Sequence, residues 1–346
     1  MAKETRVKFS TTLIFSFLFI VVAVVYFGLK PSPVSERAAP LAVTDSLDLL
    51  GLSPSDRISW IQIQNLSRKE TMTLIPQGEQ WMIKYPVYYP AKKEDVEAMV
   101  RMILSAKKVR QLVPDKDWEE YGLLNPPIKI GLETAESPKR RYLYLGAGAA
   151  LGDSIFARWE GEKEYFLLPA DVKQIFDRSV YALREKRVFR IPFSQVSKIE
   201  FEIESSHYEL VKRKEKWTWI KPREIQGMAL DEASAAALVS QIQNLFVKDF
   251  LDPETGKSDL SFFKPLSTVK IWGQGKETEV FMMGQEAPVR DAFYAKREGE
   301  EVLLLIDRNN LLEFFETVKD IAGASIIQVK TNTPASQNLP MPLASK

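Results

Sequence analysis

The sequence contains no cysteine. This absence excludes disulfide bonds, metal sites with thiolate ligands, a cysteine nucleophile and the lipidated cysteine of a lipoprotein. It leaves the cellular compartment open, because a chain of 346 residues buries enough apolar surface to fold without covalent cross-links. We therefore expect ordinary packed domains without cysteine chemistry.

Histidine is almost absent as well, since His207 is the only one in the chain. One histidine does not supply the ligand sets of the familiar zinc sites, and no acid or nucleophile is placed beside it by sequence to form a triad. The segment IESSHYEL is typical of a hairpin between two strands, and we expect His207 to be a solvated residue of its turn. The sequence predicts no metal and no cofactor.

The chain also lacks an excess of charge of either sign, with 47 basic and 46 acidic residues. Nucleic-acid binding is not expected, because it requires a basic face. The glycine-rich segment LGAGAALGDS lacks the lysine and the helix of a phosphate loop, so we interpret it as a loop between strands. With no catalytic constellation in view, the sequence does not predict an enzyme.

The strongest positive feature is an uncharged apolar run over residues 9–29. A helix of about 20 apolar residues crosses a bilayer, and the bias of Lys3, Arg6 and Lys8 predicts that residues 1–8 lie in the cytoplasm. A cleaved signal peptide is the alternative, but its apolar part usually spans only about 7–15 residues. We expect an uncleaved anchor, followed by a Pro-rich tether over residues 30–55.

The body of the chain contains a tandem repeat. The stretch GEQWMIKYP, residues 78–86, is echoed by KEKWTWIKP, residues 214–222, and further matches follow in the same order. Each copy alternates apolar and polar residues as strands do and includes an apolar stripe typical of a helix. We predict two α+β repeats, over residues 56–192 and 193–330, each a mainly antiparallel sheet with packed helices, and a disordered tail over residues 331–346.

We interpret the repeated stretch as a set of packing positions. The structural markers of the repeat are Trp81 with Pro86 in the first copy and Trp217 with Pro222 in the second. The tryptophans are expected to face a core, and the prolines are expected to end their strand.

The loop KYPVYYPA in the first copy is different, because its tyrosines have no counterpart in the second. Rigid amphipathic rings between prolines favour a partner or glycan contact, so Tyr85, Tyr88 and Tyr89 are the predicted contact residues. The alternative is a loop packed on its own helix.

Several short motifs recur along the chain. They are Trp81 and Pro86, Tyr121–Leu123 with Pro126, Leu145 and Gly146, and Phe156–Arg158, with weaker counterparts at Trp217, Pro222, Pro265, Gly284 and Tyr294–Lys296. With these motifs the chain resembles the family known as domain of unknown function 4340. The resemblance implies a bacterial envelope protein, often encoded beside an ABC-type transporter of the kind associated with gliding motility. These motifs are packing and turn positions, and no catalytic residues are implied.

The predicted anchor and tether, the balanced charge of the chain and the family resemblance together predict a single-pass inner-membrane protein. Most of its chain is expected to lie in the periplasm. We expect an accessory or scaffold protein of an envelope complex, with an ABC transporter as its partner. The alternatives are an envelope-glycan binding module, a carboxylate-dependent glycan hydrolase, which no pair of acids in the sequence supports, and a purely structural spacer.

Overall fold

The computed structural model describes residues 52, 55–112, 118–150, 152–253, 263, 265–275, 277–288 and 290–332. The predicted cytoplasmic segment 1–8, the anchor 9–29, nearly all of the tether 30–55 and most of the tail 331–346 lie outside these residues. Among the helices that are described, none is long and apolar enough to cross a membrane. The described chain forms two compact units: residues up to Glu79 with Glu94–Ala182, and Gln80–Lys93 with residues from Leu183 onward.

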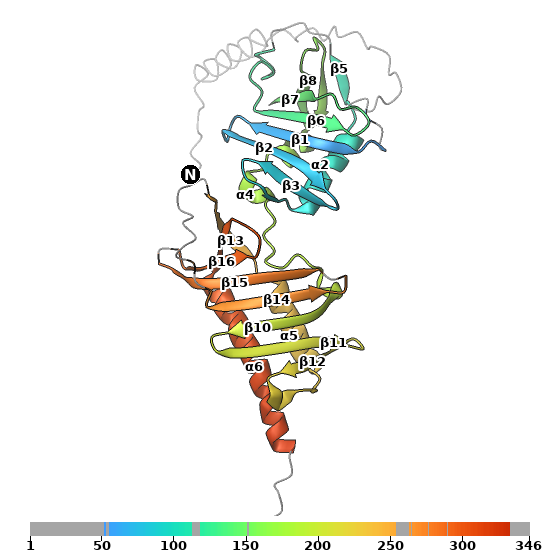
Figure 1. Ribbon diagram of the computed structural model, residues 1–346. Helices are drawn as coiled ribbons and strands as arrows, with labels where there is room; N and C mark the ends of the chain where they lie inside the picture. The colour runs from blue at the N-terminus through green and yellow to red at the C-terminus, as the bar shows by residue number, and fades with distance from the viewer. Residues whose placement is uncertain are drawn as a thin grey trace, which may run out of the picture. The chain divides into compact units, whose positions relative to one another are not determined.

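The first sheet has the strand order β4-β3-β2-β1-β6-β7-β8-β9-β5. Figure 1 labels β1, β2, β3, β5, β6, β7 and β8 of this sheet. Its strands are β1 (Ile58–Asn65), β2 (Glu70–Gln77), β3 (Gln80–Tyr85), β4 (Tyr89–Pro90), β5 (Arg110–Leu112), β6 (Ile128–Thr134), β7 (Arg141–Gly148), β8 (Ser154–Trp159) and β9 (Tyr165–Pro169). The helices of this part of the chain are α2 (Lys93–Ser105), α3 (Ala170–Phe176) and α4 (Val180–Leu183).

The second sheet has the order β12-β11-β10-β14-β15-β16-β17-β13. Its strands are β10 (Val196–Ile203), β11 (Ser206–Arg213), β12 (Lys216–Lys221), β13 (Val247–Leu251), β14 (Ser267–Gly273), β15 (Thr278–Ala287), β16 (Ala292–Arg297) and β17 (Leu303–Asp307). The helices are α5 (Glu232–Gln243) and α6 (Arg308–Asn332), with short 3-10 turns η1 (Phe193–Gln195) and η2 (Arg223–Ile225).

The two strand orders are the same apart from the extra edge strand β4. Strands β1, β2 and β3 take the places of β10, β11 and β12, and β6 to β9 take the places of β14 to β17. All the pairings with a described register are antiparallel. The prediction of mainly antiparallel sheets with packed helices is therefore confirmed.

Alternation along the strands places the core of the second sheet. In β10, Ile199 and Phe201 are fully buried, whereas Lys198 and Glu200 between and beside them are not. Successive side chains of a strand point to opposite faces, so each strand buries one set and exposes the other.

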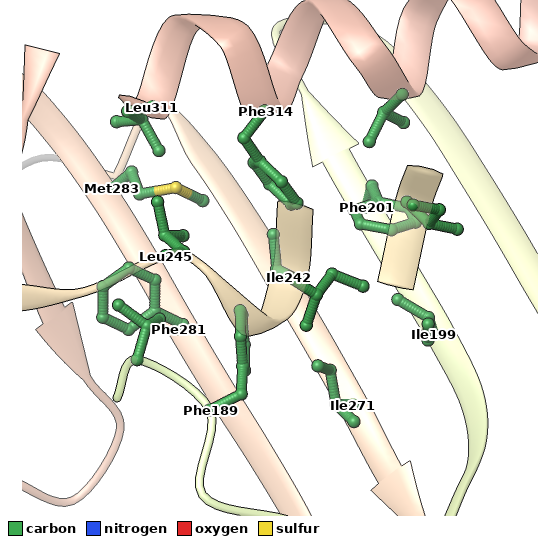
Figure 2. Close-up of a cluster of buried hydrophobic side chains, with 14 of the residues drawn as sticks. Phe189, Ile199, Phe201, Ile242, Leu245, Ile271, Phe281, Met283, Leu311 and Phe314 are labelled. Atoms are coloured by element: carbon green, nitrogen blue, oxygen red, sulfur yellow. The ribbon is translucent and has the colours of Figure 1, made fainter. Parts of the chain in front are cut away.

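The buried face of this sheet is covered by α5 and α6. Helix α5 begins after Asp231, whose carboxylate accepts a hydrogen bond of 2.8 Å from the backbone N–H of Ser234. Helix α6 buries residues three or four positions apart, namely Leu311, Phe314, Val318 and Ile321. Figure 2 shows side chains from both helices and from β10, β14 and β15 pointing toward one another. Burying each such side chain fully stabilises the fold by about 1.5–3 kcal/mol.

Candidate functional site

The motif Tyr121–Leu123 lies in a tight turn between β5 and β6. The backbone N–H of Gly122 donates to the carbonyl of Glu119 at 3.0 Å, and that of Leu123 donates to the carbonyl of Trp118 at 2.8 Å. Gly122 has a φ of +65°, in the left-handed region that glycine adopts without strain. The glycine of this motif is thus a requirement of the turn.

This turn is fixed to strand β7 at the second motif, Leu145 and Gly146. The backbone N–H of Ala147 donates to the carbonyl oxygen of Tyr121 at 2.9 Å. A Cβ atom at Gly146 would overlap that same carbonyl oxygen, so a larger residue would push the turn off the strand. The two motifs therefore depend on each other.

The third motif, Phe156–Arg158, completes the contact from strand β8. The ring of Tyr121 lies 4.4 Å from that of Phe156 and stacks on Tyr165 at 4.9 Å between centroids. Leu123 is completely buried beside them. Side chains of three motifs that are separated in the sequence thus meet on one face of the first sheet, whereas Leu145 and Ala157 of the same motifs point to the other face with Leu143.

Arg158 is the charged member of this group and is only 7% exposed. Its guanidinium lies 4.0 Å from the ring centroid of Trp118 and 4.6 Å from that of Tyr144. Its Nε and Nη2 each donate to the carbonyl of Leu123 at 3.4 Å. Burial lowers the pKa of Arg158, while Tyr144 and Glu160 act in the opposite direction. The arginine therefore holds the turn to the sheet by stacking and hydrogen bonding together.

Glu160 provides the negative charge nearby. It accepts a hydrogen bond from the hydroxyl of Tyr144, and Lys129 Nζ lies 3.3 Å from the same carboxylate oxygen, Oε1. The Tyr144 hydroxyl, with further help from Lys129, lowers the pKa of Glu160 below its usual value. We call these residues the motif cluster: Trp118, Tyr121, Leu123, Tyr144, Phe156, Arg158, Glu160 and Tyr165. Because its polar groups contact one another, its chemistry is that of a packing centre.

The predicted contact residues of the tyrosine loop separate into two groups. Tyr85 is 56% exposed and Tyr88 is 60% exposed, so both present their rings to the surface. Tyr89 is 1% exposed, and its ring packs edge-on against Phe250 at 5.1 Å between centroids. The expectation that Tyr89 contacts a partner is corrected, because its ring is buried in the hydrophobic core together with Phe250. Contact through Tyr85 and Tyr88 stays a prediction.

The structural markers of the repeat differ in burial. Trp217 is 4% exposed and packs against Phe193, whereas Trp81 is partly buried. Both Pro86 and Pro222 follow a cis peptide bond, so the two copies share this backbone conformation as well as the residue types.

The only histidine is not where the sequence placed it. His207 lies in strand β11, where it is paired with Glu202, and the turn of this hairpin is formed by residues 204 and 205. The expectation of a solvated turn residue is therefore wrong. Nitrogen or oxygen atoms of Glu200, His207 and Glu209 lie within 4.8 Å of one another, which makes this the group of described residues able to hold a metal ion.

The missing signal was the register of the hairpin. Once residues 204 and 205 are taken as its two-residue turn, the pairing of Glu200 with Glu209 follows by counting, and His207 falls on the same face two residues from Glu209.

Comparison with known proteins gives a family and nothing more specific. Neither the curated proteins nor the solved structures contain a match to this chain. A family model described as "Domain of unknown function (DUF4340)" matches residues 81–265. The matched region begins at Trp81 and includes the three motifs of the motif cluster as well as Trp217 and Pro222. Because it covers more than half of the sequence, the chain belongs to the DUF4340 family.

Proposed function

We propose that this protein is a membrane-anchored accessory protein of a bacterial envelope complex, and that its partner is an ABC transporter of the inner membrane. The uncharged run 9–29, preceded by Lys3, Arg6 and Lys8, supports an anchor with its N-terminus in the cytoplasm. In this proposal the two folded units lie in the periplasm and bind the transporter there.

The observation that carries the proposal is the exposure of Tyr85 and Tyr88. Each of these large side chains is more than half exposed, in a loop with a proline between them at position 86. Tyrosine is enriched in protein interfaces, because its ring buries a large apolar area while its hydroxyl finds a polar partner. Two such rings close together in sequence favour a protein contact at this loop.

The loop also has a firm support. Its second half forms β4, in which Tyr89 pairs with Ile83. The ring of Tyr89 is buried and packs against Phe250, which holds the strand in place. The backbone N–H of Lys92 donates to the carbonyl of Leu183 at 2.7 Å. A loop held in this way loses little conformational entropy when it binds, which favours affinity.

Affinity purification of the full-length protein in mild detergent tests the proposal. We expect transporter subunits to co-purify with the wild type and to be lost with a Tyr85→Ala, Tyr88→Ala double variant. Tyr181→Ala is the matched control, since Tyr181 is 46% exposed in another part of the chain. Repeated recovery of the wild type without transporter subunits contradicts the proposal.

The orientation has its own test. Alkaline phosphatase fused after Lys346 is expected to be active, because this enzyme folds in the periplasm. Activity of a cytoplasmic reporter at the same position contradicts the proposed topology.

Glycan binding is the second candidate, and the same exposed pair of rings favours it, since flat amphipathic rings stack on sugars as well as on protein. Retention of the protein on purified peptidoglycan, lost in the double variant but kept in Tyr181→Ala, would favour this candidate. Equal retention of the wild type and the double variant eliminates it.

A further inference from the structure

Two carboxylates face each other on the outer side of the second sheet, away from the core of Figure 2. Glu200 in β10 and Glu209 in β11 are directly paired across antiparallel strands. Like charges at such positions repel, so a cation between them stabilises the pair. Glu209 is only 8% exposed, so a cation stabilises the pair more here than at an open surface.

His207 adds a nitrogen ligand to these oxygens. It lies two residues before Glu209 on the same strand, so both side chains project from the same face. Its Nε2 atom is buried and has no hydrogen-bond partner among the described residues. A buried ring nitrogen left without a partner inside a protein is a common starting point for metal coordination.

The three residues together form a ligand set of one nitrogen and two oxygens, with the atoms within 4.8 Å of one another. Three protein ligands that leave a fourth position for water are the arrangement of many zinc sites. Imidazole favours transition metals over magnesium and calcium, which prefer oxygen alone. We propose that Glu200, His207 and Glu209 bind a divalent transition metal ion, with zinc as the preferred ion.

The ammonium group of Lys198 lies between the two carboxylates, where the metal ion would bind. Its Nζ lies 2.6 Å from Glu200 and 2.9 Å from Glu209, and it also lies over the ring of Trp272 at 4.6 Å. Lys221 lies 3.5 Å from the second oxygen of Glu209. The ammonium group of Lys198 carries one charge and zinc carries two, so zinc replaces it between the carboxylates and Lys198 turns to solvent. Binding is thus an exchange, and Lys198 sets the affinity.

The test is zinc titration by calorimetry on the full-length protein, prepared without a histidine tag and stripped with a chelator. We expect one zinc ion per chain. His207→Ala and Glu209→Gln each weaken binding by at least about tenfold, because even the loss of a residue that only orients a metal ligand costs about 10–100-fold in affinity. Lys198→Ala tightens binding, because it removes the competing ammonium group. Glu215→Gln is the matched control, since Glu215 is also paired with a lysine of β11, Lys212, at 2.7 Å.

A second measurement separates coordination from a change of fold. Cobalt bound in place of zinc gives a visible spectrum that depends on its ligands, and this spectrum is expected to change in His207→Ala while the circular dichroism does not. Zinc affinity equal to the wild type in His207→Ala overturns the proposal. So does the failure of both the wild type and Lys198→Ala to take up zinc.

Discussion

The outer faces of the two sheets differ although their strand orders agree. On the first sheet the outer face carries the motif cluster, in which aromatic rings surround Arg158 and hold the turn of Tyr121–Leu123. On the second sheet it carries the charged group of Lys198, Glu200 and Glu209. The shared strand order depends on the buried faces, whereas each outer face is free to acquire its own contacts.

The inner faces differ in a more limited way. The first sheet is followed by a helix of 7 residues, α3, and the second by one of 25 residues, α6. The longer helix reaches Trp219, whose Nε1 donates to Ser325 at 3.1 Å, while the counterpart in the first copy is Ile83. The copy with the longer helix, α6, thus has the larger side chain, Trp219, at this position of its sheet.

The largest effect is expected from the echoed tryptophans. Trp217→Ala should lower the free energy of unfolding by about 3–5 kcal/mol, because it leaves a cavity in the core. Trp81→Ala should cost clearly less, since Trp81 is only partly buried. Urea unfolding followed by circular dichroism measures both. Equal losses would show that the two copies bury their tryptophans equally, and would remove this part of the comparison.

The next largest effect is a difference in stability between substitutions at two glycines of strand β7. Gly146→Ala should destabilise the fold by about 1–3 kcal/mol, because its Cβ overlaps the carbonyl oxygen of Tyr121 and the turn must move. Gly148→Ala is the control, since a Cβ at Gly148 meets nothing within 4 Å. Thermal unfolding compares the two variants. A Gly146→Ala variant as stable as Gly148→Ala would contradict the link between the motifs.

Much of the fold was predictable because it depends on local patterns. Alternation of apolar residues identified the strands, and spacing of three and four identified α5. The matching order of elements in the two copies predicted two similar antiparallel sheets. The motif residues were also interpreted correctly as packing and turn positions. Their meeting in one cluster was not predictable, because it depends on how the turn of Tyr121–Leu123 crosses the sheet.

Two errors have a common physical origin. Tyr89 and His207 were both assigned to loops, yet each lies in a strand, β4 or β11. A shift of one residue at the end of a strand reverses the face to which a side chain points. Loop boundaries are therefore where sequence patterns predict burial least well, and both errors concern residues next to a turn or a proline.

The third prediction concerns a substitution that gives the first sheet a residue of the second. Arg158→Lys introduces the residue found at the equivalent position of the second copy, Lys296. We expect a loss of about 1–2 kcal/mol, because lysine keeps the charge but not the planar stacking on Trp118 or the two hydrogen bonds to Leu123. The reverse change, Lys296→Arg, is the control and should be nearly neutral. Thermal unfolding that is unaffected by Arg158→Lys would mean that the cation itself is sufficient.

The smallest effect is a dependence on pH at the charged group of the second sheet. Burial of Glu209 opposes its ionisation, but hydrogen bonding by Lys198 and the charges of Lys198 and Lys221 outweigh this, so its pKa is lowered. The ionised carboxylate therefore stabilises the folded state at pH values above the unfolded pKa of about 4.3. As the pH falls below that value the unfolded state takes up a proton first, and the contribution is lost.

Glu209→Gln removes this contribution, so the wild type should exceed the variant in stability by up to about 1 kcal/mol at pH 7, and the difference should shrink on acidification toward pH ~3. Urea unfolding in the presence of a chelator measures it without interference from metal. Glu160→Gln on the first sheet has the same sign, because the Tyr144 hydroxyl lowers the pKa of Glu160. Its effect should be weaker, since the Glu160 side chain is 46% exposed and solvent screens its charge. A constant difference between pH 7 and pH ~3 at Glu209 would mean that its ion pairs contribute nothing to stability, and the two outer faces would then be equivalent in this respect.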